Sequence, residues 1–170
     1  MRKIKLASML FLFSLSCSDE IVEPKVFGEG DDYLIYESVL KDFASKDSLL
    51  IVLNDSTYGE SFDSNSVKYF QGNIPEMSSE TFYNYILVNN QKMKLNRISG
   101  IDFVFLSEFK NDQKHVDVFL SKVGYNNLKT QALLTMGAVW APLAGIGTLI
   151  YLEKNGMVWE IRKTIMTWIS

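Results

Sequence analysis

The chain has one cysteine, Cys17. Its thiol is the side-chain group to which the sequence assigns the most specific chemistry. An apolar stretch of ten residues, Leu6–Leu15, precedes it. The segment before that stretch carries three basic residues, Arg2, Lys3 and Lys5. A basic start, a short apolar stretch and a small residue before the break are typical of a secretory signal. Ten residues are too few for a membrane-spanning helix, which needs about 20. Residues 1–16 are therefore predicted to be a signal peptide.

The segment Ser14-Leu15-Ser16-Cys17 resembles a bacterial lipobox, although Ser14 stands where lipoboxes usually carry leucine. This resemblance implies that a diacylglycerol is joined to the Cys17 thiol and that cleavage leaves Cys17 as the first residue. Cys17-Ser18-Asp19-Glu20 is also similar to the acidic start of many lipoproteins of the Bacteroidota. That similarity implies attachment to the outer membrane and export to the cell surface. The alternative is an ordinary secreted protein with a chance cysteine at its cleavage site.

Three regions follow from this interpretation: a signal peptide (1–16), a lipidated cysteine with a flexible tether (17–31), and one globular domain (32–170). The tether contains Pro24, Gly28 and Gly30 among charged residues, a composition typical of linkers. Once three of the 17 basic residues leave with the signal, the 20 acidic residues outnumber the basic ones by six. This acidic balance disfavours nucleic acid as a partner. Acylation would leave no free thiol, so a disulfide, a zinc–thiolate site and a cysteine nucleophile are not expected.

Other polar groups could do chemistry only with partners that the sequence does not supply. His115 is the only histidine, so we expect a solvated residue in a polar turn rather than a triad or metal ligand. The loop with Asp55, Glu60, Asp63 and Asn65 is rich in oxygen atoms, but its glycine and acidic spacing does not match an EF-hand. Glu76 and Glu80 are four residues apart, where they would repel mildly on a helix. We therefore expect no catalytic residue, no metal site and no cofactor.

The strongest candidate for binding is the apolar segment Gly137–Gly147, which is expected to be a loop between two strands. Trp140, Pro142 and Leu143 lie at its centre and are the predicted ligand-binding residues. If their side chains are exposed, they form a contiguous apolar patch of the kind that marks an interaction site. The alternative, which we favour at this point, is that the loop folds over the end of the sheet and buries Trp140.

The spacing of apolar residues predicts the helices and strands that position these residues. A first helix is expected from Asp31 or Asp32 to Lys46, and a second from Pro75 to about Asn89. Residues Asn54–Asn65 are expected to be a loop. Strands are expected at the following ranges: Leu49–Leu53, Ile101–Phe109, Val116–Gly124, Gln131–Met136, Gly147–Glu153 and Met157–Ile161, with a final strand to Ser170. The predicted fold class is α+β, with N-terminal helices packed on a C-terminal antiparallel meander sheet.

Asn155-Gly156 stands between two apolar runs and predicts a β-hairpin with a type I′ turn. After it, the alternation of apolar and polar residues slips near Lys163–Thr164, which predicts a β-bulge. Residues Thr130–Leu152 contain no charge, so a membrane helix is an alternative on length alone. Its glycines and Pro142 argue against that alternative.

About the last 55 residues resemble a group of small bacterial proteins of unknown function. The resemblance rests on these segments: Leu120–Asn126, Lys129–Leu133, the glycines Gly145 and Gly147, Leu152–Gly156 and Trp168-Ile169-Ser170. It implies relatedness and assigns no chemistry. Helices before an antiparallel sheet also resemble cystatin-like or NTF2-like folds, which is an analogy of fold alone.

The function expected from the sequence is a non-enzymatic lipoprotein of the cell envelope that binds a protein or a small ligand. Its partners are then the membrane, through the Cys17 lipid, and an envelope component. Two alternatives stay open. One is an envelope hydrolase whose carboxylates the sequence does not identify, and the other is a structural component of the envelope.

Overall fold

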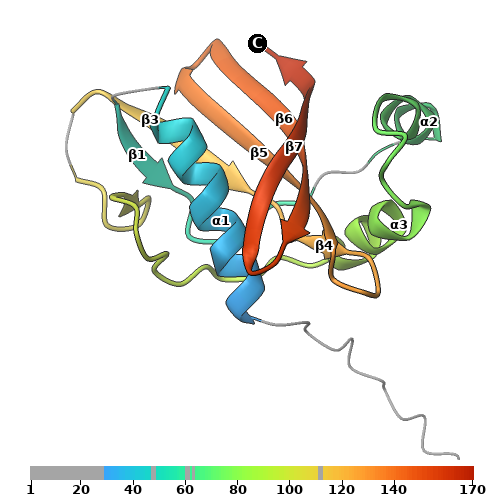
Figure 1. Ribbon diagram of the computed structural model, residues 1–170. Helices are drawn as coiled ribbons and strands as arrows, with labels where there is room; N and C mark the ends of the chain where they lie inside the picture. Colours follow the sequence, from blue (N-terminus) through green and yellow to red (C-terminus); the bar gives the residue numbers. More distant parts are fainter. Residues whose placement is uncertain (1–28, 47–48, 60–61, 63, 111–112) are drawn as a thin grey trace, which may run out of the picture.

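The computed structural model describes residues 29–46, 49–59, 62, 64–110 and 113–170. In this part of the chain, three helices and a seven-stranded sheet form a mixed α and β fold, with most of the sheet in the C-terminal half (Figure 1). Cys17, the predicted signal peptide and most of the predicted tether lie outside the described residues. Glu29–Asp31, the last three residues of that tether, belong to the first helix.

The helices are α1 (Glu29–Ala44), α2 (Ser64–Asn73) and α3 (Ser79–Val88). The strands are β1 (Leu50–Leu53), β2 (Val104–Phe105), β3 (His115–Leu120), β4 (Gly124–Tyr125), β5 (Gln131–Ala141), β6 (Ala144–Asn155) and β7 (Val158–Ile169). The order in the sheet is β2-β1-β3-β5-β6-β7, and β4 also pairs with β5.

The sheet is mixed, so the prediction of an antiparallel meander is wrong for its N-terminal part. Strand β1 pairs in parallel with both β2 and β3, whereas β3, β4, β5, β6 and β7 pair antiparallel. The connection from β1 to β3 contains α2, α3 and β2, and a connection of that length permits parallel pairing. β1 is a short apolar strand with three of its four residues buried, as expected for a parallel strand covered on both faces.

Helix α1 lies against one face of the sheet (Figure 1). Its apolar face, with Ile35, Val39 and Leu40, shares one core with alternate residues of β5, such as Ala132 and Leu134. Tyr36 extends the same contact, because its hydroxyl donates a hydrogen bond of 3.0 Å to the Ser121 carbonyl. The predicted first helix is confirmed, with its start two residues earlier than Asp31.

Helices α2 and α3 pack on the opposite face, in a second core that includes Leu133 of β5 and Tyr151 of β6. Helix α2 was not expected from the sequence, and its first two residues belong to the predicted loop Asn54–Asn65. Helix α3 was expected to begin at Pro75 but begins at Ser79. Ser78 is its N-cap, and the Ser78 hydroxyl accepts a hydrogen bond from the Thr81 backbone N–H.

The predicted strand Val116–Gly124 is divided into β3 and β4, because the residues between them bond to the end of helix α3. The Lys122 backbone N–H donates to the side-chain oxygen of Asn89, at 2.8 Å, rather than to β5. The predicted strand Ile101–Phe109 is also shorter than expected. It is reduced to β2, because the chain turns after Phe105, where the Phe109 N–H bonds the Phe105 carbonyl.

The hairpin of β6 and β7 is confirmed, but its turn differs from the prediction. Asn155 pairs with Val158, so Gly156 and Met157 form the two-residue loop. Only Gly156 has a positive φ there, at 62°, which fits a type II′ turn with glycine first rather than type I′. The predicted bulge is confirmed at Arg162, because Tyr151 pairs with Lys163 while Leu152 pairs with Ile161. The uncharged segment Thr130–Leu152 lies mainly in strands β5 and β6.

Gly124 allows the backbones of α3 and β4 to touch. A Cβ at this position would overlap the backbone nitrogen and Cα of Tyr85, neither of which can swing aside. We therefore expect Gly124→Ala to lower the free energy of unfolding by roughly 2–4 kcal/mol, as overpacking of a rigid core contact does. Urea unfolding followed by tryptophan fluorescence measures this change.

The matched control is Gly72→Ala, because a Cβ at Gly72 meets nothing within 4 Å. Alanine in helix α2 should be neutral or stabilising by up to about 1 kcal/mol. Equal stability of the two variants would contradict the close packing of α3 on β4.

Candidate functional site

The predicted binding residues lie at the end of the β5–β6 hairpin, which we call the hairpin tip and define as residues 140–144. The expected loop Gly137–Gly147 is mostly strand, because β5 continues to Ala141 and β6 begins at Ala144. Only Pro142 and Leu143 lie between the strands. Pro142 is exposed and the Leu143 side chain is 86% exposed, so both project from the fold.

The expectation that Trp140 is buried as part of the core is wrong, because its side chain is 39% exposed. The β5–β6 register shifts between Val139 and Ala141, so Trp140 occupies an irregular position in the hairpin. Its ring is held from one side by Phe43, in the last turn of α1, at a centroid distance of 6.4 Å. Trp140 is thus fixed in orientation and still accessible.

Trp168 supports the hairpin below the tip. Its indole ring lies against Gly145 and Gly147, and a Cβ on either glycine would be too close to the ring. The end of the chain is joined to the same strand, since the Ser170 N–H donates to the Gly145 carbonyl at 3.0 Å. The strand residues next to the tip are therefore held by side-chain packing and by backbone hydrogen bonds.

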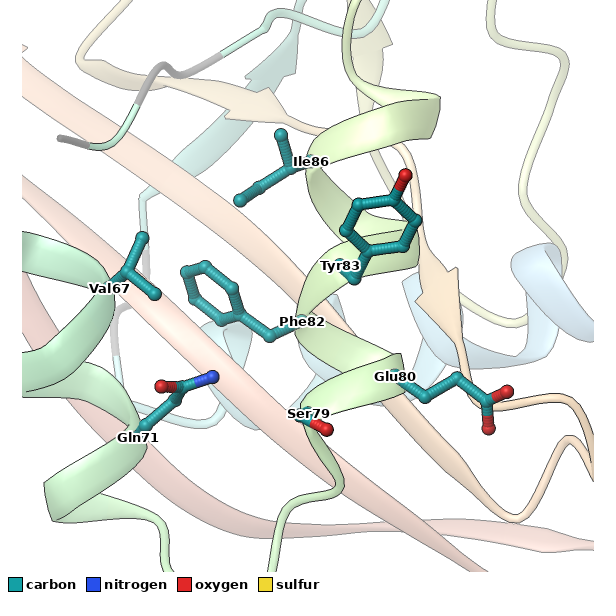
Figure 2. Close-up of a pocket in the computed structure, with 7 residues that line it drawn as sticks. All are labelled: Val67, Gln71, Ser79, Glu80, Phe82, Tyr83 and Ile86. Carbon is teal, nitrogen blue, oxygen red and sulfur yellow. The ribbon is translucent and has the colours of Figure 1, made fainter. Parts of the chain in front are cut away.

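A second candidate surface is the α2–α3 groove, which has a volume of about 510 Å³ (Figure 2). Its lining consists of Val67 and Gln71 from α2 and of Ser79, Glu80, Phe82, Tyr83 and Ile86 from α3. Figure 2 shows the Phe82 ring between the two helices, with Val67 on the facing helix. The lining is mainly apolar, and a single carboxylate, that of Glu80, lies on it.

Asp32, in the first turn of α1, is a buried carboxylate that is 8% exposed. The Tyr125 hydroxyl donates a hydrogen bond of 2.5 Å to the Asp32 Oδ1. Burial raises the pKa of Asp32 to about 6, although the hydrogen bond from Tyr125 and the charge of Lys129 oppose that rise. The pKa of Tyr125 is raised as well, first by burial and then by the charge of Asp32.

A raised pKa is typical of catalytic acids, but the surroundings of Asp32 make it a structural group. Its neighbour Asp31 is paired with the Lys154 ammonium at 3.1 Å. The partner hydroxyl belongs to Tyr125, which is itself buried and packs on Trp159 at a ring distance of 5.7 Å. Asp32 thus joins α1 to strand β4 of the sheet.

His115 begins strand β3 rather than lying in a turn, and it is half-buried. Its ring packs on Phe109 at 4.4 Å, its Nδ1 lies 2.8 Å from the Gln113 carbonyl, and its Nε2 lies 3.5 Å from Asp117. These contacts position the end of a strand.

Neither the oxygen-rich loop nor the acidic pair forms a site among the described residues. Asp55 accepts hydrogen bonds from the backbone and the hydroxyl of Ser107, whereas Glu60 and Asp63 lie outside the described residues. Glu76 precedes α3, so it does not share a helix with Glu80 as expected, and Glu80 accepts hydrogen bonds from Asn127. Among the described residues, no group of three acidic, histidine or cysteine side chains could hold a metal.

Comparison with known proteins finds no match to a protein-family model, to a curated protein or to a solved structure. The resemblances stated for the sequence therefore stay predictions. None of the helices in the described ranges is long and apolar enough to cross a membrane.

Asp32 makes stability depend on pH. Because its pKa is about 6 in the folded protein and 3.8 ordinarily, its protonated form favours folding. This stabilisation is fully present below pH 3.8, falls as the pH rises to 6, and is lost above pH 6. The difference between the two pKa values corresponds to about 3 kcal/mol. An asparagine in its place would stay neutral and could still accept the Tyr125 hydrogen bond. We expect Asp32→Asn to stabilise the protein by roughly 1–3 kcal/mol at pH 7.5 and to have little effect at pH 3.5.

The control is Asp42→Asn, which removes a surface ion pair between Asp42, on the same helix as Asp32, and Lys46, in the turn after that helix. Its effect at pH 7.5 should stay below about 0.5 kcal/mol. Urea unfolding of the wild type, Asp32→Asn and Asp42→Asn at pH 3.5 and pH 7.5 measures these free energies of unfolding. Destabilisation by Asp32→Asn at pH 7.5 would show that the Asp32 charge supports the fold.

Proposed function

We propose that this protein is a non-enzymatic binding module of the cell envelope, anchored to the outer membrane through a lipid on Cys17, and that its hairpin tip binds a partner protein. The observation that carries the proposal is the exposure of an uncharged apolar tip on a rigid hairpin. Leu143 is 86% exposed and Trp140 is 39% exposed, and both belong to the same hairpin end. Exposed apolar clusters mark interaction sites, and tryptophan is enriched among the residues that dominate binding energy.

The position of the tip suits an anchored binding module. Helix α1 begins at Glu29, where the predicted tether joins the domain, and its last turn contacts the tip through Phe43. A helix of 16 residues is about 24 Å long. In Figure 1, α1 begins at the bottom and the β5–β6 turn lies at the top. The tip is therefore presented about one helix length away from the tether.

A hydrolase would require accessible acidic groups that converge on a substrate. Of the carboxylates in the described residues, Asp32 has the raised pKa, and it is buried and bonded to Tyr125. This arrangement supports binding over catalysis. The cystatin-like or NTF2-like architecture is retained as an analogy of fold, and it adds no function.

The anchor is tested by Cys17→Ala in cells. We expect the variant to leave the membrane fraction and to incorporate no labelled fatty acid, because the thiol is the site of acylation. Ser18→Ala keeps the thiol and should stay in the membrane fraction with its label. If the Cys17→Ala protein stays in membranes, the lipoprotein interpretation is overturned.

The binding tip is tested with the photo-reactive residue p-benzoylphenylalanine in place of Leu143. Leu128, in the turn before β5, is the matched control because it is 81% exposed and lies away from the tip. Irradiation of intact cells should give discrete cross-linked adducts from position 143 and at least ten-fold fewer from position 128. Equal yields from both positions would contradict a binding role for the tip.

A further inference from the structure

One chain carries both an exposed apolar projection, the hairpin tip, and a mainly apolar hollow, the α2–α3 groove. We propose that the hairpin tip of one copy docks into the α2–α3 groove of a second copy, so that the protein assembles head to tail. This inference rests on the proposed function, because it names the partner of the same tip.

The apolar surfaces match. The tip projects Leu143 and Pro142, and no residue from Trp140 to Ala144 carries a charge. The groove has half-buried Val67 and Ile86 as apolar walls and exposed Tyr83 on its lining, whereas Phe82, between the helices, is already buried in the second core. Its volume is about 510 Å³, and it is open to solvent rather than enclosed, so a projecting side chain can reach it from outside. An apolar projection that enters such a groove removes both surfaces from water, which is the main favourable term in association.

The charges beside the two surfaces are opposite. Glu80 lies on the groove lining, and exposed Glu76 precedes the same helix. At the tip, exposed Lys114 immediately precedes β3, which runs antiparallel to β5 with Asp117 opposite Val139. Lys114 therefore lies at the tip end of the sheet. Opposite charges around an apolar contact favour one orientation and speed encounter.

The contact must join two copies. The tip and the groove lie at different ends of the fold, with α2 and α3 on the side of the sheet opposite α1 (Figure 1). Each copy thus keeps a free groove when its tip is bound. Such a heterologous contact repeats along a row of copies until a ring closes.

The small size of the contact explains where assembly would occur. A single hairpin tip buries much less than the roughly 1,600 Å² of a standard interface, so affinity in dilute solution should be low. Copies anchored in one membrane have a high effective concentration, which raises occupancy without new contacts. Assembly is therefore expected on membranes and is expected to be weak in solution.

The experiment uses the full chain in cell membranes, with p-benzoylphenylalanine in place of Leu143. Cells that make this protein together with an epitope-tagged copy that keeps Leu143 are irradiated, and the adducts captured through the tag are analysed by mass spectrometry. We expect captured adducts that join position 143 of the untagged copy to peptides spanning residues 67–86, and multimers larger than a dimer. Adducts to a different protein alone would overturn self-assembly and leave the proposed function standing. Equal adduct yields at positions 143 and 128 would overturn both.

A charge exchange tests the same contact without the photo-reactive residue. Leu143→Asp should reduce disuccinimidyl suberate cross-linked multimers in membranes at least ten-fold. Tyr83 lines the groove and is 62% exposed, so Tyr83→Arg should leave the fold intact, and its guanidinium adds a positive charge without adding an amine that the cross-linker could attack. Copies with Leu143→Asp and copies with Tyr83→Arg, mixed in one membrane, should recover at least a third of the multimers. Leu128→Asp, as the control, should change the yield less than two-fold. Multimers that survive Leu143→Asp would overturn the proposal.

Discussion

Strand β5 is buried on both faces, and the rest of the structure depends on this constraint. Ala132 and Leu134 face α1, whereas Leu133 faces α2 and α3, and each of the three is fully buried. Because side chains alternate along a strand, a shift of one residue would exchange these two sets between different environments. The register of β5 with β3 and β6 is thus fixed by two cores together.

The two candidate surfaces are consequences of this strand. β5 extends beyond its doubly covered part to the tip, where Phe43 packs on Trp140. The groove exists because α2 and α3 turn part of their apolar surface toward each other rather than toward β5. Phe70 and Phe82, for example, approach at 6.3 Å while both contribute to the second core. A doubly buried strand therefore positions a projection and a groove on one rigid scaffold.

Local patterns in the sequence predicted the C-terminal hairpins and α1 because those elements depend on neighbouring residues. The Asn-Gly signal and the slip in alternation near Lys163 identified the hairpin and its bulge. Helix α2 was missed although Val67, Phe70 and Ile74 recur at helical spacing, and its first two residues were included in the expected loop Asn54–Asn65. The parallel pairing of β1 with β3 joins segments about 60 residues apart, and no local pattern encodes that choice.

The sequence selects the candidate binding residues, but it does not predict the form of the hairpin that carries them. Trp140, Pro142 and Leu143 could be selected from their types, but the length of β5 and the register shift beside Trp140 decide their exposure. The joint role of Asp32 and Tyr125 was not predictable, because these residues are 93 positions apart and meet only in the folded chain.

The most direct test of the account is hydroxyl-radical footprinting of Leu143 and Trp140, in native membranes and in the dilute purified protein. A tip that binds a partner should be labelled at least five-fold less in membranes, while Leu128 is labelled equally in both. Equal labelling of Leu143 in the two states would contradict the claim that the hairpin tip is the binding end of this protein.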